Sequence, residues 1–137
     1  MTNVLWVGDM HVEPHDLEDS KALGDLILQT AKEHNALTVL AGDLYHSHAI
    51  INAFVQYFWY SFFEEFKKAG LDVIAIKGNH DAPNTEGIEA TSLIAHVEQC
   101  IAVMHRPHVK NRLLFCPYTT NDNLAKWSAE HPECNTL

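Results

Sequence analysis

The fold is decided by the stretch Val73-Ile74-Ala75-Ile76-Lys77-Gly78-Asn79-His80-Asp81. Its four leading apolar residues predict a short buried strand, and Gly78 predicts a turn soon after it. Beyond the turn, an amide, an imidazole and a carboxylate follow one another. Open α/β sheets bind their ligands outside the carboxyl ends of their strands, so we expect a functional site at Asn79, His80 and Asp81.

Two earlier strands are predicted to end in the same way. Residues 4–7 are an apolar run that ends at Gly8-Asp9-Met10-His11, and residues 37–41 are a second expected strand that ends at Gly42-Asp43. Glycine permits a tight turn and a close backbone approach. Because neighbouring parallel strands lie about 4.8 Å apart, side chains beyond the three strands are expected to converge.

The converging side chains are of the types that bind metal ions. Carboxylates, imidazoles and amide oxygens suit divalent ions such as Mn²⁺, Fe²⁺ or Zn²⁺. Two such ions about 3.5–4 Å apart form a clamp for in-line attack at phosphorus. One Asp after a strand often only caps a helix, but three such motifs at successive strand ends are hard to obtain by chance. The sequence therefore predicts a metal site.

The remaining pattern predicts an α/β fold. Asp16 is a plausible N-cap for a first helix, and residues 71–76 form the third strand. Helices are expected at residues 17–34, 50–69, 86–97 and 121–130, and the last of them would be capped by Asn121 or Asp122. Two further strands are expected at residues 100–104 and 113–116. Residues 105–112 are expected to be a polar connection, and residues 135–137 could open another strand. Strands alternating with helices imply a mainly parallel sheet with flanking helices.

The expected helix at residues 50–69 is unusually aromatic. One apolar face is predicted, made by Ile51, Phe54, Val55, Phe58, Phe62 and Phe66. The segment carries more aromatic residues than one face needs, so two interpretations remain. A broadly buried core helix is favoured over a surface that binds a partner.

Composition limits the possible classes of protein. The chain has 137 residues, 47% hydrophobic and 20% charged, which is a globular composition. No apolar run reaches the roughly 18 residues of a membrane span, and no signal peptide is recognisable. Three widely spaced cysteines without a CxxC pair indicate neither a disulfide framework nor a thiolate zinc site, which favours a reducing cytoplasmic setting. The net charge of −9 argues against non-specific coating of nucleic acid, but bound cations would still permit a phosphate substrate.

The three motifs Asp9-Met10-His11, Gly42-Asp43 and Gly78-Asn79-His80-Asp81, in this order, resemble the first signature motifs of calcineurin-like metallophosphoesterases. The resemblance extends from Val4 to about Tyr118. It implies the N-terminal half of a four-layer α/β/β/α fold. Residues 113–118 look like a segment of the nuclease branch, which includes SbcCD-type repair nucleases and phage relatives. That branch implies a DNA substrate, an ATPase subunit as partner and, for a phage protein, the host cytoplasm.

The resemblance also implies a role for each matching residue. Asp9 and His11 would bind the first metal ion, Asp43 would bridge both ions, and Asn79 would bind the second. His80 would contact the phosphate and protonate the leaving oxygen, with Asp81 tuning its imidazole. Mn²⁺ is the preferred identity of the two ions, with Fe²⁺, Zn²⁺ or Mg²⁺ as alternatives. The nucleophile would be a metal-bound hydroxide.

The chain departs from the family pattern after these motifs. No glycine precedes a histidine, so the later Gly-His-x-His element is absent and both metal shells would be incomplete. Residues 1–137 are therefore expected to be a metallophosphoesterase domain that is incomplete at its C-terminus. Three functions remain open: a DNA phosphodiesterase, a phosphatase or cyclic-nucleotide phosphodiesterase using the same site, and a non-catalytic truncated scaffold.

Other histidines and one basic cluster are secondary candidates. His46 and His48 follow Asp43 closely and could contact metal ligands or substrate, or could belong to a solvated loop. Histidine and cationic residues between His105 and Arg112 form the only basic cluster of the sequence. The cluster could contact a phosphate backbone, although solvated charges are the commoner case.

Overall fold

A computed structural model of the chain describes residues 3–47, 50–81, 100–104, 106–110 and 112–136. The expected helix at residues 86–97 lies outside the described residues. Four parallel strands form one sheet in the order β1-β2-β3-β4. They are β1 (Val4–Val7), β2 (Leu37–Leu40), β3 (Val73–Ile76) and β4 (Ala102–Met104). The predicted parallel α/β fold is confirmed, with strand ends that differ from the prediction by one or two residues.

Two helices cover one face of this sheet: α1 (Leu17–His34) and α2 (Ala53–Lys68). The helix α1 ends as expected, with Asn35 in the left-handed conformation as its C-cap. Its N-cap is Asp16, but the Asp16 carboxylate bonds to the Glu13 amide and the Ser20 hydroxyl and makes no capping bond. The helix α2 begins three residues later than predicted, because the Asn52 side chain accepts a hydrogen bond from the Phe54 N–H and caps it there.

A second, smaller sheet faces the first. It contains β5 (His108–Lys110), β6 (Leu113–Phe115) and β7 (Asn135–Thr136), with β5 antiparallel and β7 parallel to β6. The prediction of a polar connection at residues 105–112 is wrong in part, because the strand β5 lies within this range. The strand expected after residue 134 is confirmed. The helix α3 (Asn121–Glu130) follows β6 and is capped by Thr120 instead of Asn121 or Asp122.

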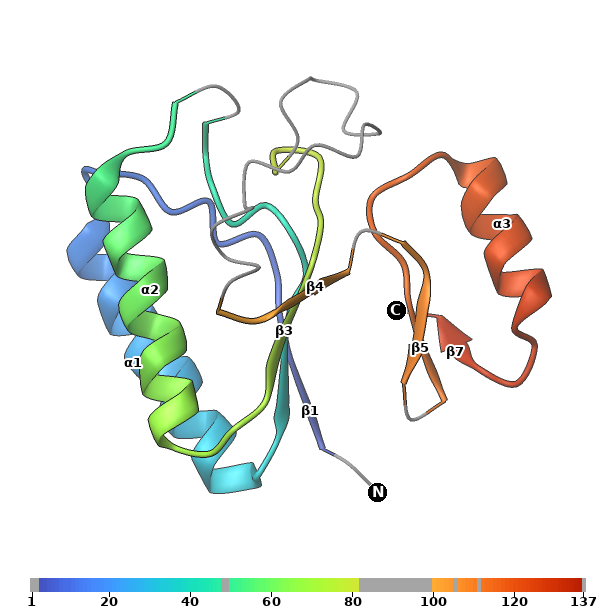
Figure 1. Cartoon of the computed structure of the whole chain (residues 1–137), viewed down its shortest axis with the longest axis horizontal. Helices are drawn as coiled ribbons and strands as arrows, with labels where there is room; N and C mark the ends of the chain where they lie inside the picture. The colour runs from blue at the N-terminus through green and yellow to red at the C-terminus, as the bar shows by residue number, and fades with distance from the viewer. Residues whose placement is uncertain (1–2, 48–49, 82–99, 105, 111, 137) are drawn as a thin grey trace.

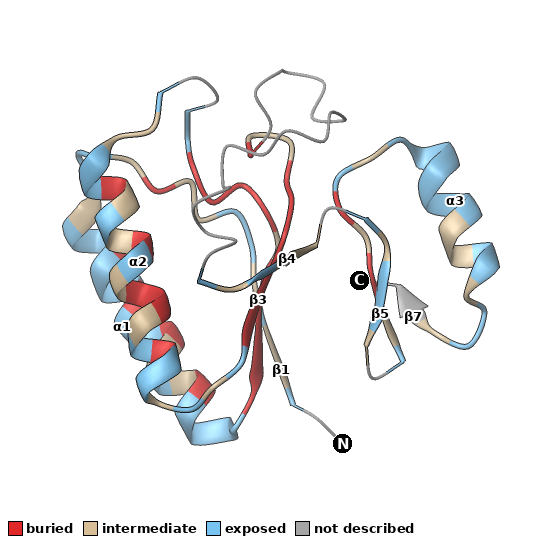
Figure 2. Ribbon diagram, in the orientation of Figure 1, coloured by how far each residue is buried: buried red, intermediate tan, exposed pale blue. Residues whose placement is uncertain are grey.

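The layers follow one another as helices, sheet, sheet and helix (Figure 1), which is the α/β/β/α order that the resemblance implies. Phe115 of β6 packs against the central strands, in a cluster with Val39 and Ile74. The residues of β2 and β3 are all buried, as the colouring of Figure 2 shows along the middle of the molecule. No helix in the described part of the chain has the length and apolar character needed to cross a membrane.

The apolar face of α2 differs from the prediction. Its buried residues are Val55, Trp59, Phe62, Phe63 and Phe66. Phe54 was expected on this face but is 70% exposed, and Tyr57 and Tyr60 are also exposed. Because α2 contains eight aromatic residues, its sequence is compatible with two overlapping apolar faces. Packing against the rest of the molecule decides which face is buried. The helix therefore contributes to the core and also presents aromatic side chains to solvent.

We expect Phe54→Ser to change the free energy of unfolding by less than about 0.5 kcal/mol, as surface substitutions usually do. Its neighbour Val55 is 2% exposed and provides the matched comparison. Val55→Ala removes two buried methyl groups and should cost about 1.5–2 kcal/mol. Chemical denaturation of both variants measures the two values, and an equal cost would contradict the observed helix orientation.

Candidate active site at the carboxyl ends of the strands

Two glycines allow the segments after β2 and β3 to touch. A Cβ atom on Gly42 would lie 2.7 Å from the Cα of Gly78, and Gly42 also has a positive φ of 101°. A Cβ atom on Gly78 would lie 2.2 Å from Oδ1 and 2.4 Å from the backbone nitrogen of Asp43. Real Cβ contacts are not this short, so only glycine fits at either position. This close approach fixes the place of Asp43.

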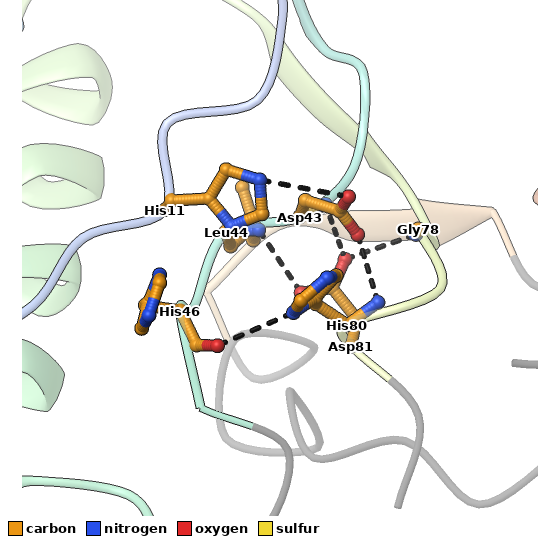
Figure 3. Close-up of polar contacts among 7 residues, drawn as sticks. All are labelled: His11, Asp43, Leu44, His46, Gly78, His80 and Asp81. Carbon is orange, nitrogen blue, oxygen red and sulfur yellow. Dashed lines mark hydrogen bonds and ion pairs between the residues drawn. The ribbon is translucent and has the colours of Figure 1, made fainter. Parts of the chain in front are cut away.

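Asp43 joins three segments that are far apart in the sequence (Figure 3). Its Oδ1 accepts a 2.8 Å hydrogen bond from the backbone N–H of His80, and its carbonyl accepts a 2.9 Å bond from the N–H of His11. Its Oδ2 lies 3.8 Å from Nε2 of His11. The loops after β1, β2 and β3 therefore meet at one largely buried carboxylate.

Three of the predicted metal-binding residues have left-handed backbone conformations. The φ angles are 28° at Asp9, 44° at His11 and 51° at Asp43. Such conformations are uncommon for residues other than glycine, and they gather at binding and catalytic sites, where the surrounding structure holds them. Their occurrence at the strand ends favours a functional interpretation of these loops.

The described hydrogen bonds of Asp81 go to three backbone N–H groups. Its side chain is fully buried, and its Oδ2 accepts hydrogen bonds from the N–H groups of Asp43 and Gly78, both at 2.9 Å. Its Oδ1 accepts a 3.0 Å bond from the N–H of Leu44. Burial raises the pKa of Asp81, while these three donors act in the opposite direction by stabilising the charged form. Both oxygens thus hold backbone loops together, which is a positioning role.

The His80 ring lies next to other histidines. Its Nδ1 is 3.2 Å from the carbonyl oxygen of His46, so the nitrogen that makes this bond carries a proton. The ring centroids of His11 and His80 are 4.9 Å apart, and those of His11 and His46 are 5.8 Å apart. His46 thus joins the imidazole group through its ring and its backbone. His48 lies outside the described residues.

A cavity of about 310 Å³ lies beside Asp43, which is one of its lining residues. Asp9, Asp43 and Asn79 line it together, whereas His11 and His80 are absent from its described lining. The predicted site residues therefore form two groups that share Asp43: an oxygen-bearing group in the cavity and an imidazole group beside it.

Among the described residues, seven more line the cavity, and the sequence assigned none of their side chains a role in chemistry. They are Trp6, Ala41, Ile76, Lys77, Gly78, Cys116 and Tyr118. The Tyr118 N–H donates a 2.9 Å bond to the Lys77 carbonyl, which ties the segment after β6 to the site. Burial lowers the pKa of Lys77, and the nearby Asp81 carboxylate acts against this effect. Trp6 and Lys77 lie within or directly after predicted strands, which was the available signal for them.

The donor atoms fit divalent cations, but the side chains are not arranged as a compact metal shell. Among the described residues, no group of three or more His, Cys, Asp or Glu side chains is placed to hold one ion. Two carboxylates and an amide share the cavity, and the buried Nδ1 of His11 has no hydrogen-bond partner among the described atoms. An unpaired buried nitrogen is costly, and it suits a site that a cation completes.

Comparison with known protein families identifies a match. The family model described as calcineurin-like phosphoesterase matches residues 2–131, which include all three strand-end motifs. No curated protein matches the chain significantly.

Proposed function

The chain belongs to the calcineurin-like phosphoesterase family, and we propose that it is a nuclease of this family, which hydrolyses phosphodiester bonds in DNA. Family membership by itself supports metal-dependent hydrolysis of phosphoesters, without specifying the substrate. The observation that carries the proposal is the position of Asp43, where three strand-end loops meet beside a cavity that also holds Asp9 and Asn79.

We propose a role for each residue of the site, in line with the family resemblance. Asp9, His11, Asp43 and Asn79 would hold two divalent ions, Mn²⁺ in our proposal. Such ions supply charge neutralisation and a nucleophile derived from water near neutral pH. His80 would donate a proton to the leaving oxygen, since an imidazole can carry a proton near pH 7. Its backbone is fixed by Asp43 and its Nδ1 faces the His46 carbonyl, so the ring is oriented before substrate binds.

Two half-exposed aromatic side chains favour a nucleic-acid substrate over a simple phosphate monoester. Trp6 is 44% exposed and Tyr118 is 49% exposed, and both line the cavity. Aromatic faces beside a phosphate site can stack on bases, at about 1–3 kcal/mol per base. An ATPase subunit of the SbcCD type is the partner that we propose from the nuclease branch.

The site as described also supports a second candidate, a scaffold without catalysis, because no compact metal shell is present among the described residues. The Gly-His-x-His element does not occur in these 137 residues. We propose that further metal ligands come from outside them and strengthen the Mn²⁺ binding that Asp9, His11, Asp43 and Asn79 already provide.

Metal binding and hydrolysis together test the proposal. Titration calorimetry with Mn²⁺ should show binding by the chain, and Asp43→Ala should remove it, while Asp25→Ala on the surface of α1 should not. Mn²⁺-dependent cleavage of DNA and of bis(p-nitrophenyl) phosphate should fall to background in Asp43→Ala and His80→Ala, with the exposed His15→Ala as control. Absence of Mn²⁺ binding would favour the scaffold, and activity unaffected by both substitutions would refute the assigned site. Cleavage of phosphate monoesters or cyclic nucleotides, but not of DNA, would favour the other enzyme classes.

A further inference from the structure

The first hairpin of the second sheet concentrates positive charge in an acidic protein. Arg106, Lys110 and Arg112 are three of the nine Lys and Arg residues of a chain whose net charge is −9. They lie at or beside β5, with His108 as the first residue of that strand. We call Arg106, His108, Lys110 and Arg112 the basic hairpin. His105 lies outside the described residues and is not included.

The basic hairpin starts beside the cavity. His108 pairs with Phe115, and the next residue of that strand segment, Cys116, lines the cavity. On the other side, the Met104 carbonyl accepts a 3.2 Å hydrogen bond from the N–H of Lys77, another cavity residue. Arg106 is two residues from Met104 and two residues from His108, so its backbone lies close to the cavity.

The charges then continue along β5, away from the cavity. Lys110 is two residues beyond His108 on the same face of the strand, a separation of about 6.6 Å. This separation corresponds to about two nucleotides of a DNA strand, because the phosphate charges of one strand repeat about every 3.4 Å along the axis. β5 is also at the edge of its sheet, so within the described part of the chain no strand pairs with its outer side.

The described structure does not neutralise these cations. Arg106 and Arg112 are exposed and Lys110 is partly buried, and none of the three forms an ion pair with a described residue. In contrast, Lys67, Lys68 and Lys126 each lie within 4.0 Å of a glutamate on their own helix. The charge of the basic hairpin is therefore available to a ligand.

We propose that the basic hairpin binds the phosphate backbone of the DNA strand whose scissile phosphate enters the cavity. This inference rests on the proposed function and adds a binding surface to it. A protein of net charge −9 repels a polyanion at long range, so a local strip of cations is needed where the strand leaves the site. Arg106 and Lys110 neutralise phosphates and release counterions, which makes binding strongly dependent on salt.

The salt dependence of DNA binding tests this inference. Fluorescence anisotropy with a labelled single-stranded phosphorothioate DNA and Mn²⁺ gives the association constant between about 50 and 200 mM salt. In the double variant Arg106→Ala/Lys110→Ala, the slope of log K against log[salt] should fall in magnitude by about 1.4, at roughly 0.7 per phosphate. The variant Arg106→Lys/Lys110→Arg keeps both charges and should keep the slope, and this rescue separates charge from folding.

A matched control removes the same charge elsewhere. Lys32→Ala/Lys126→Ala changes residues on α1 and α3 and should leave the slope unchanged. Equal slopes for the wild type and the Arg106/Lys110 variant would overturn the inference, and so would an equal loss in the control. Stronger competition by polyglutamate than by unlabelled DNA at the same ionic strength would also overturn it, in favour of an acidic protein ligand.

Hydrolysis of bis(p-nitrophenyl) phosphate separates this inference from the proposed function. That substrate has no polymer backbone, so the Arg106→Ala/Lys110→Ala variant should hydrolyse it at the wild-type rate. If the wild-type protein cleaves DNA and the variant keeps the wild-type salt slope, only the DNA-binding role of the basic hairpin is refuted. A wild-type protein that hydrolyses the small diester and does not bind DNA would refute both the DNA substrate and the hairpin, and leave phosphoester hydrolysis standing.

Discussion

Gly78→Ala is expected to abolish Mn²⁺ binding and phosphodiester hydrolysis and to lower the free energy of unfolding by about 3 kcal/mol or more. The added Cβ atom would lie 2.2 Å from Oδ1, 2.4 Å from the backbone nitrogen and 2.9 Å from Cγ of Asp43. Two of these atoms belong to the carboxylate that joins the three loops, and the third is backbone that cannot move aside cheaply. Displacement of a catalytic group by about 1 Å already costs on the order of 100-fold in rate.

Gly8 provides the control for this experiment, because it ends the first strand in the equivalent way. A Cβ atom on Gly8 would meet nothing within 4 Å. Gly8→Ala should therefore keep its metal binding and activity and change stability by less than about 0.5 kcal/mol. Calorimetric titration and chemical denaturation of the two variants make the comparison. Similar behaviour of Gly8→Ala and Gly78→Ala would show that the close approach of β2 and β3 is not what holds Asp43.

Asp81→Ala should be about as damaging, although Asp81 is fully buried and is not among the residues that line the cavity. The substitution leaves three N–H groups without their acceptor, those of Asp43, Leu44 and Gly78. Each unsatisfied buried donor costs about 1–3 kcal/mol, and partial access of water reduces the sum, so we expect a loss of about 3–5 kcal/mol. Activity should fall as well, because the Asp43 backbone loses its anchor.

Asp81→Asn distinguishes this positioning role from tuning of the His80 imidazole. Asparagine keeps one acceptor oxygen but directs an N–H₂ group at a backbone donor, so we expect an intermediate cost of about 1–3 kcal/mol. The exposed Asp25→Asn is the matched control and should have no effect. If Asp81 positions the loops, stability and rate fall together and the pH at which the rate is half-maximal stays constant. A shift of that pH at unchanged stability would restore the predicted tuning of His80.

The sheet and its strand ends could be predicted because the sequence carries their signals locally. Each central strand is a predominantly apolar run, interrupted in β2 only by Thr38, and a turn residue follows it. The same holds for the C-terminus of α1, where the left-handed Asn35 is a common helix end. Local patterns of this kind do not require knowledge of what the segment packs against.

Features that depend on pairing and packing partners were not predictable. β5 is three residues long with an exposed, alternating polar pattern, and it is a strand because it pairs with β6, which follows it in a hairpin. The exposure of Phe54 follows from which aromatic residues of α2 meet α1 and the sheet. The partners of Asp81 lie 37 and 38 residues earlier in the chain, at Leu44 and Asp43. Residue type alone predicted a carboxylate at the site, but it did not predict which groups that carboxylate faces.

The hydrogen bond between Tyr118 and Lys77 sets the earliest point of synthesis at which the cavity can be complete. The cavity needs the loops that carry Asp9, Asp43 and Asn79, and also the wall formed by Cys116 and Tyr118. Contacts this far apart in sequence pay their loop-closure entropy late, so they slow folding. A nascent chain on the ribosome can thus build the α1–α2 layer and the parallel sheet early, while the cavity closes only after residue 118 has been released.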